Sequence, residues 1–259
     1  MMNRNAYNQQ VGCSKLSTLF LWLILLFPLL INSCNKSNGV ESITGIEINH
    51  VIFIGLDGWG GHYNLNIMPF LKGKIDGGWY KLDKEAEMPT GSAPNWASIF
   101  MGVSPNIHGY LDWDAKEPSF SYDFEIENNI YPTIFQILRK QKPSSEIGVF
   151  CQWEGIKYLV DTLSINTLGY YPLKSYTNEM FCKSVKEYVS GQKPSLCAII
   201  FDEPDNTGHR QGFFKEEYNV MLSTLDSLIR DIEIATQKAG IYESTVFIPK
   251  IRNYHPIHD

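Results

Sequence analysis

Three short stretches of this sequence place chemically versatile side chains next to apolar segments. Asp57 follows the run VIFIGL, and Asp205 and His209 follow the run SLCAIIF by a few residues. Carboxylate and imidazole groups are ligands for divalent metals. We expect DNTGH, which holds Asp205 and His209, to be a loop that turns both side chains toward one point. Each stretch alone is also compatible with an ordinary solvated loop, so the chemistry depends on whether the stretches meet.

The third stretch carries a hydroxyl group. Ser92 precedes Pro94 and the run NWASIFM, which ends near Gly102. We expect Ser92 to be the N-cap of a helix, with Pro94 in the first turn, where its missing N–H is not needed. Such a hydroxyl lies at the positive end of the helix dipole beside free backbone N–H groups, a setting that favours an alkoxide and binds phosphoryl oxygens. A capping serine without a catalytic role is the alternative.

The segments that must position these groups alternate between strand-like and helix-like patterns. Strands are expected at 50–56, 146–153 and 195–201 and from 244 onward, and helices at 131–141, 177–191 and 215–239. This alternation predicts an α/β fold, a mainly parallel sheet with helices on both faces. Because the carboxyl ends of parallel strands share one edge of the sheet, Asp57 and Asp205 are expected at that edge.

Length and charge limit the class of protein. The chain has 259 residues, enough for one large α/β domain. Its formal net charge is -6 and its pI is about 5.5, without a compensating run of Lys and Arg. This balance argues against nucleic acid or an anionic membrane surface as the main partner.

The N-terminal segment has the features of an export signal. Arg4 and Lys15 precede the uncharged run LSTLFLWLILLFPLLI, which is short for a spanning helix and is followed by INSC. The INSC sequence resembles a bacterial lipobox, so we expect residues 1–33 to be a lipoprotein-type signal peptide, Cys34 to carry lipid and 34–48 to be a tether. The protein would then be anchored in the bacterial cell envelope, periplasmic or surface-exposed. A secreted protein and an uncleaved N-terminal helix remain the alternatives.

The cysteines suggest no metal site, because no CxxC spacing occurs. Cys197 lies inside an apolar strand and is expected to be a small buried hydrophobe. Cys151 and Cys182 would be able to pair in an oxidising compartment, and the sequence leaves that pairing open.

Taken together, LDG, PTGSAPNWASIFMGVSPNIHG and EPDNTGH resemble, in this order, the alkaline-phosphatase superfamily, most closely its type I phosphodiesterase/nucleotide pyrophosphatase family. The resemblance extends from residue 50 to residue 248. It implies a partial alkaline-phosphatase-like domain over 49–259, a three-layer sandwich incomplete at its C-terminus, and hydrolysis of a small-molecule phosphate ester or nucleotide through a phosphoserine. It also implies two Zn²⁺ ions, one bound by Asp57 and the nucleophile Ser92, the other by Asp205 and His209. Thr90 is the alternative hydroxyl.

Two departures from the family pattern affect the expected function. Trp113 stands where the family has an Asn directed at the phosphoryl group, so a phosphomonoesterase or another hydrolase of the superfamily stays possible. The family's DHG segment, with further zinc ligands, is replaced after Ile248 by PKIRNYHPIHD, and we do not expect the tail residues His255, His258 and Asp259 to substitute. The alternative function is therefore a truncated, inactive fragment or a non-enzymatic lipoprotein with the same fold.

Overall fold

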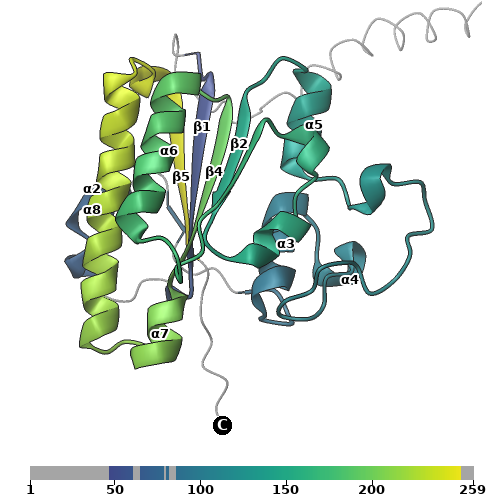
Figure 1. Ribbon diagram of the computed structural model, residues 1–259, viewed down its shortest axis with the longest axis horizontal. Coiled ribbons are helices and arrows are strands. Elements are labelled where there is room, and N and C mark those ends of the chain that lie inside the picture. The colour runs from purple at the N-terminus through teal and green to yellow at the C-terminus, as the bar shows by residue number, and fades with distance from the viewer. Residues whose placement is uncertain (1–46, 61–64, 79, 82–85, 252–259) are drawn as a thin grey trace, which may run out of the picture. The chain divides into compact units, whose positions relative to one another are not determined.

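The computed structural model describes residues 47–60, 65–78, 80–81 and 86–251 (Figure 1). The chain divides into an N-terminal unit, Met1–Gly45, and a second unit, Ile46–Asp259, which contains every element described below. The predicted signal peptide with Cys34, and the tail residues His255, His258 and Asp259, lie outside the described residues.

The second unit alternates strands and helices as the sequence predicts. In chain order its elements are β1 (His50–Asp57), η2 (Leu65–Ile67), α2 (Pro69–Gly77), α3 (Ser92–Met101), α4 (Pro105–His108), η3 (Glu127–Asn129), α5 (Ile134–Gln141), β2 (Ile147–Cys151), η4 (Glu154–Tyr158), η5 (Thr162–Ser164), β3 (Thr167–Tyr170), α6 (Asn178–Gln192), β4 (Leu196–Pro204), α7 (Asp205–Gln211), α8 (Glu216–Lys238), η6 (Tyr242–Ser244) and β5 (Thr245–Ile251), where η marks a short 3₁₀ helix.

The described strands form one parallel sheet in the order β3-β2-β4-β1-β5. Helices cover both faces: α2, α6 and α8 lie on one side, and α3, α4 and α5 on the other (Figure 1). Alternate residues of each strand point to opposite faces. Thus Ile52 and Ile199 pack in the core under α6 and α8, whereas Ala198 and Ile200 pack in the core under α3 and α5. The predicted three-layer α/β fold is confirmed.

The cysteines behave as core residues. Cys197 is fully buried, as predicted. Cys151 and Cys182 belong to the cores on opposite faces of the sheet, and both are free thiols, so the disulfide left open by the sequence is not formed. Burial raises the pKa of Cys151 to about 12 and that of Cys182 to about 11. Both groups are therefore thiols, not reactive thiolates, at neutral pH.

The structure differs from the sequence-based elements around β4. This strand continues to Pro204 instead of ending near Phe201, and the expected loop DNTGH is the helix α7. The buried side chain of Glu203 explains the helix, because its Oε2 accepts from the Thr207 N–H at 2.9 Å and its Oε1 from Asn206 Nδ2 at 3.1 Å. These bonds satisfy donors of the first turn.

Smaller differences concern the other elements. The helix expected to end at Gly191 continues to Gln192 and is closed by Lys193 in the left-handed conformation. The helix α2 and the short strand β3 were not predicted. At the start of α2, the N–H groups of Phe70 and Leu71 each donate to the carboxylate of Asp226 from α8 at 2.9 Å. This long-range cap is not visible in the local sequence.

No helix in the described part of the chain is both long and apolar enough to cross a membrane.

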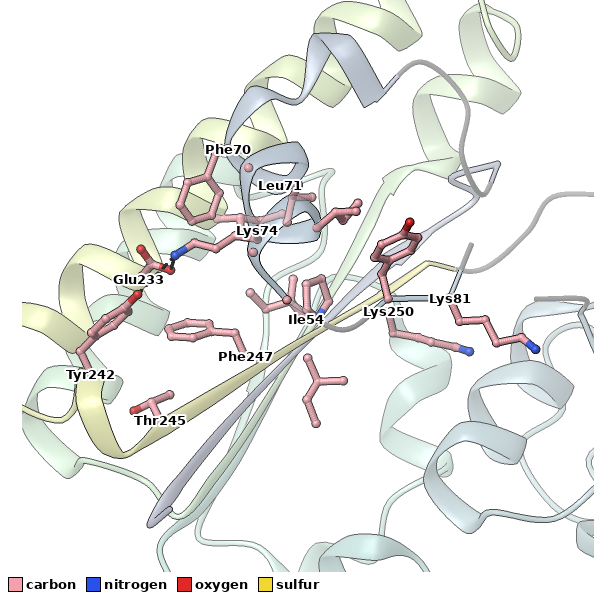
Figure 2. Close-up of a pocket in the computed structure, with 18 of the residues that line it drawn as sticks. Ile54, Phe70, Leu71, Lys74, Lys81, Glu233, Tyr242, Thr245, Phe247 and Lys250 are labelled. Carbon is pink, nitrogen blue, oxygen red and sulfur yellow. Dashed lines mark hydrogen bonds and ion pairs between the residues drawn. The ribbon is translucent and has the colours of Figure 1, made fainter. Parts of the chain in front are cut away.

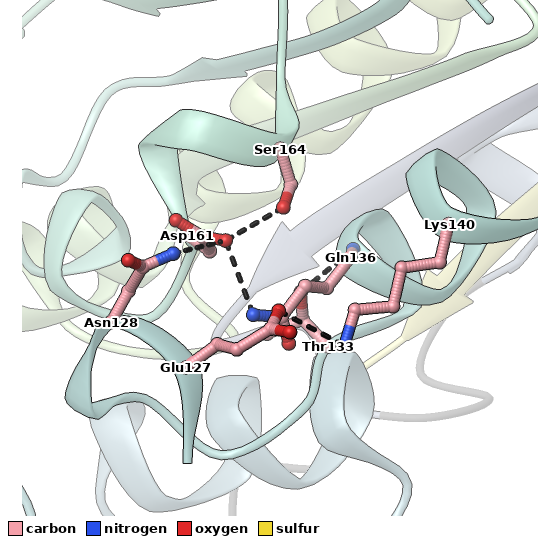
Figure 3. Close-up of polar contacts among 7 residues, drawn as sticks. All are labelled: Glu127, Asn128, Thr133, Gln136, Lys140, Asp161 and Ser164. Atoms are coloured by element: carbon pink, nitrogen blue, oxygen red, sulfur yellow. Dashed lines mark hydrogen bonds and ion pairs between the residues drawn. The ribbon is translucent and has the colours of Figure 1, made fainter. Parts of the chain in front are cut away.

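A polar network holds the long connection between α4 and α5 to the rest of the unit (Figure 3). The buried carboxylate of Asp161 accepts at Oδ2 from Ser164 Oγ at 2.6 Å, Asn128 Nδ2 at 3.1 Å and Gln136 Nε2 at 3.2 Å. Its Oδ1 accepts from the Leu163 N–H at 3.0 Å. Four donors thus surround one buried acceptor, which ties η3, η5 and α5 together.

Candidate functional site

The first two chemical stretches meet at the carboxyl edge of the central strands. The strand β1 pairs with β4, and after a register shift Asp57 lies opposite Pro204, the residue before Asp205. Gly58 adopts a positive φ of 69°, and a Cβ added there would lie 2.4 Å from Asp205 Oδ1. The turn that follows Asp57 therefore runs directly against the Asp205 side chain, and a residue with a side chain at Gly58 would push the two apart.

Asp205 and His209 lie on one face of α7. They are four positions apart, which is about one helical turn, and His209 Nε2 lies 3.3 Å from Asp205 Oδ2. The loop prediction was wrong, but the helix brings the two groups together as expected. The side chain of His209 is largely exposed, whereas that of Asp205 is mostly covered. Edge-on contact with Phe213 supports the imidazole from one side.

Ser92 is the first residue of α3, and the N-cap position belongs to Gly91. The predicted N-cap assignment was therefore wrong by one residue. Ser92 nevertheless lies at the positive end of the helix dipole of α3, as expected. The expectation of free N–H groups fails at Ala93, because that N–H donates to the carbonyl of Trp113 at 2.9 Å. Trp113, whose side chain is 65% exposed, thus borders the serine through its backbone.

Trp96 connects the serine helix to the first carboxylate. Its indole Nε1 donates to Asp57 Oδ2 at 3.0 Å, and both side chains are buried. Ser92 and Trp96 are four residues apart on α3, so they share the face that is turned toward β1. The structure therefore brings the third stretch to the same edge of the sheet as the other two.

Asn95 fixes the segment that leads into α3. Its Nδ2 donates to the carbonyls of Glu87, Pro89 and Gly91 at 3.1–3.2 Å, and its Oδ1 accepts from the Glu87 N–H at 2.9 Å. The sequence motif showed this Asn only as part of PN. Its contacts show that it holds the backbone on both sides of Thr90.

Negative charge is concentrated at this edge. Burial, reinforced by the charges of Asp57, Asp205 and Glu203, raises the pKa of Asp202 to about 8. The backbone N–H of Asp202 donates to Oε1 of the buried Gln152 at 3.1 Å, which anchors the end of β4. Sequence reasoning assigned Asp202 no role, and the signal that it missed was the continuation of β4 past Phe201. The charges of Asp57, Asp205 and Glu203 therefore all act on Asp202.

The side chains at this edge determine which ligands are available to a metal ion. Carboxylate and imidazole ligands suit a divalent cation, and a positive charge here would favour ionisation of Asp202, whose pKa is raised mainly by burial and further by the neighbouring carboxylates. Across the described residues, no three His, Cys, Asp or Glu side chains are close enough to bind one ion. The described residues at this edge thus supply carboxylate and imidazole donors but no group of three such ligands.

The histidine of the motif PNIHG belongs to the core. His108 is fully buried, its Nδ1 accepts from the Tyr110 N–H at 3.1 Å, and its Nε2 lies 2.9 Å from Ser98 Oγ. Burial lowers the pKa of His108 to about 4. The neutral imidazole thus braces α4 against α3 and is not among the groups that face the carboxylates.

A groove of about 760 Å³ lies elsewhere, along α2, α8 and the edge strand β5 (Figure 2). Its walls include Phe70 and Phe247, and Lys74 and Glu233 form an ion pair across it at 2.5 Å. None of the four residues predicted to bind metal lines this groove. The chemistry predicted from the sequence therefore belongs to the strand edge and not to this groove.

Comparison with curated proteins gives the same assignment over most of the chain. The family model for type I phosphodiesterase/nucleotide pyrophosphatase matches residues 51–248. Human ectonucleotide pyrophosphatase/phosphodiesterase family member 1 is 22% identical over 222 residues, which are 76% of this chain and 22% of the human protein. Venom phosphodiesterase 2 of Crotalus adamanteus is 22% identical over 200 residues, 70% of this chain and 24% of the venom protein. The chain thus spans about a quarter of the length of these relatives.

Solved structures show the same fold. Murine ectonucleotide pyrophosphatase/phosphodiesterase 5, an inactive variant in complex with AMP, superposes with a TM-score of 0.62 at 19% sequence identity. The match covers 79% of this chain and 56% of the murine chain. The human protein of the same name superposes with a TM-score of 0.59. With its parallel sheet, its three motifs at one strand edge and a family match over residues 51–248, the chain belongs to the type I phosphodiesterase/nucleotide pyrophosphatase family of the alkaline-phosphatase superfamily.

Proposed function

We propose that this protein hydrolyses phosphodiester or pyrophosphate bonds of small molecules such as nucleotides, with Ser92 as the nucleophile. The observation that carries the proposal is the meeting of three separate motifs at one edge. Trp96 ties the helix of Ser92 to Asp57, and Gly58 lies against Asp205. The AMP complex of the murine relative supports a nucleotide as substrate.

In the proposed reaction, Ser92 Oγ loses its proton and forms a new bond to phosphorus, while the bridging oxygen of the substrate leaves with its electron pair and takes up a proton. Water then cleaves the bond between Ser92 Oγ and phosphorus, which releases a phosphate monoester such as a nucleoside monophosphate and restores the hydroxyl. Ser92 is suited to this attack because it opens α3, where the helix dipole favours developing negative charge on its oxygen.

We propose Asp57 and Asp205, with His209 beside them, as the residues that hold a divalent cation, with Zn²⁺ as the candidate. A cation at this position would neutralise charge on the attacked phosphoryl group and favour the ionised form of the serine. The protein's own part is to hold the two carboxylates on neighbouring strand ends, so that a phosphoryl group at Ser92 lies beside both.

A second candidate is a phosphate-ester binding protein without turnover. It is favoured by the absence of a group of three metal-binding side chains from the described residues. Two metal ions with full ligand sets, as the sequence resemblance implies, would need ligands beyond those that the described residues bring together.

The two candidates are separated by measuring hydrolysis of bis(p-nitrophenyl) phosphate and of a dinucleotide by the purified full chain with added Zn²⁺. We expect turnover, and we expect Ser92→Ala to lower kcat by at least ~1000-fold. Thr90→Ala is the matched control, two residues away in the same segment, and should retain activity. Loss of activity in the Thr90 variant alone would assign the nucleophile to Thr90. Absence of hydrolysis in the unaltered chain would favour the binding protein.

A further inference from the structure

The indole of Trp96 is buried within the core under α3 and α5, where a Trp needs no special explanation. Its ring lies on the backbone of Gly55, where an added Cβ would be 2.3 Å from the ring, and it stacks on Phe100 with ring centroids 6.0 Å apart. These contacts require a large flat side chain. They do not require the N–H group of the indole.

The N–H group has a specific partner. A buried indole must give its proton to an acceptor, and most acceptors within a core are backbone carbonyls. Here the acceptor is Oδ2 of Asp57, a side chain that is 2% exposed and that comes from a different element. A hydrogen bond to an ionised carboxylate is stronger than one to a neutral acceptor and fixes the plane of the carboxylate.

The position of Trp96 on its helix adds a second constraint. Ser92 is one turn before Trp96 on the same face of α3. Because the ring is seated on Gly55 and its nitrogen bonds to Asp57, two contacts set how far the start of α3 lies from the end of β1.

We propose that Trp96 is a positioning residue for the reaction: its indole N–H orients the Asp57 carboxylate toward a bound cation and holds that carboxylate at the correct distance from Ser92. This inference rests on the proposed function, because it needs a cation at Asp57. It adds a residue whose role neither the sequence motif nor the comparisons assign. Groups that orient metal ligands through hydrogen bonds commonly change metal affinity by 10–100-fold when they are removed.

The test compares three variants of the full chain by titration with Zn²⁺ alone, in the absence of substrate. Trp96→Phe keeps a flat ring on Gly55 but removes the donor, and we expect its Zn²⁺ dissociation constant to rise at least tenfold. Phe100→Leu disturbs the packing around Trp96 while leaving the donor in place. Tyr110→Phe removes a different buried hydrogen bond, from Tyr110 Oη to the Tyr158 carbonyl at 3.1 Å, away from the carboxylates. Both controls should bind Zn²⁺ like the unaltered chain.

Unfolding curves of the metal-free proteins accompany the titration. They separate a folded Trp96→Phe protein with weak Zn²⁺ binding, which supports the inference, from a protein that has lost its fold. If Trp96→Phe fails to fold, titration of Phe100→Leu decides, since unchanged affinity in that variant shows that packing on the ring does not set the site.

Two results overturn the inference, and they are distinguishable. In the first, Trp96→Phe binds Zn²⁺ as tightly as the unaltered chain, or Phe100→Leu loses as much Zn²⁺ affinity as Trp96→Phe. Either outcome excludes a role for the indole N–H but leaves the proposed function intact. No Zn²⁺ binding by the unaltered chain removes the cation from the proposed function and the role of Trp96 with it.

Discussion

Two regions of this molecule cover carboxylates, and the two regions differ in the groups that surround those carboxylates. Around Asp161, four donors converge on one carboxylate (Figure 3). At the carboxyl edge of β1 and β4, the carboxylates of Asp57, Asp202 and Asp205 are neighbours, and their mutual repulsion contributes to the raised pKa of Asp202. Folding alone favours the first arrangement, because a buried charge is tolerated when donors surround it. In the second, folding makes the Asp202 carboxyl group harder to ionise, which costs stability.

The largest effect is expected at Asp161, whose carboxylate is surrounded by hydrogen-bond donors. Asp161→Ala leaves the donors of Asn128, Gln136 and Ser164 without their buried acceptor, and we expect the free energy of unfolding to fall by about 3–4 kcal/mol. Urea denaturation measures it. Glu127→Ala is the control from the same region, since its ion pair with Lys140 is exposed and contributes less than about 1 kcal/mol. Similar losses in both variants would mean that Asp161 is no more important than a surface charge.

The pH dependence of stability tests whether His108, the histidine of PNIHG, is a neutral core residue. Its folded pKa, lowered by burial to about 4, lies below the ordinary value of about 6.5. Folding thus favours the neutral ring, so its contribution to stability is complete above pH 6.5 and is lost as the pH falls toward 4. Between pH 7 and pH 4.5 the unaltered chain should lose about 2 kcal/mol more than His108→Gln.

Thermal and urea unfolding at both pH values give that difference. Because both proteins share every other titrating group, the difference between them isolates the imidazole. An identical pH dependence in the two proteins would show that His108 is not held neutral, and would place it with the site instead of the core.

The smallest effect is expected at Asp202, at the carboxyl edge of β4, where a substitution should raise the free energy of unfolding. At pH 7 the folded protein holds the Asp202 carboxyl group largely protonated, mainly because it is buried, whereas the unfolded chain ionises it. Asp202→Asn removes that cost of folding, so in the presence of EDTA we expect the free energy of unfolding to rise by about 1 kcal/mol. Asp231→Asn is the control, since that carboxylate already pairs with Lys186 at 3.2 Å and its loss should not stabilise the protein. Destabilisation by Asp202→Asn would contradict a cost of burying the Asp202 carboxyl group.

The fold was largely predictable because its signals are local. The apolar runs of β1 and β4 and the long helical pattern of α8 were visible in the sequence, and the rule that parallel strands end at one edge placed Asp57 near Asp205. DNTGH was predicted as a loop because its helix depends on capping by Glu203, a side chain that was counted only as part of an acidic run.

The sequence predicted which candidate residues lie at the strand edge, but not the side chains that hold them there. Trp96 contacts Asp57 across 39 positions of sequence, and nothing near Trp96 identifies its acceptor. Gln152 holds the Asp202 backbone across an interval of 50 residues. These partners follow from the register of β1, β4 and β2, which local patterns do not determine.

The strand order has a consequence for the order of events during synthesis. The strand β1 leaves the ribosome first, yet both of its neighbours in the sheet, β4 and β5, come from the end of the chain. At ordinary rates of translation, Asp57 waits on the order of ten seconds before Asp205 emerges. During that interval the apolar strand before Asp57 has no partner for its hydrogen bonds, which makes it a natural binding segment for chaperones and the point at which premature association between nascent chains would begin.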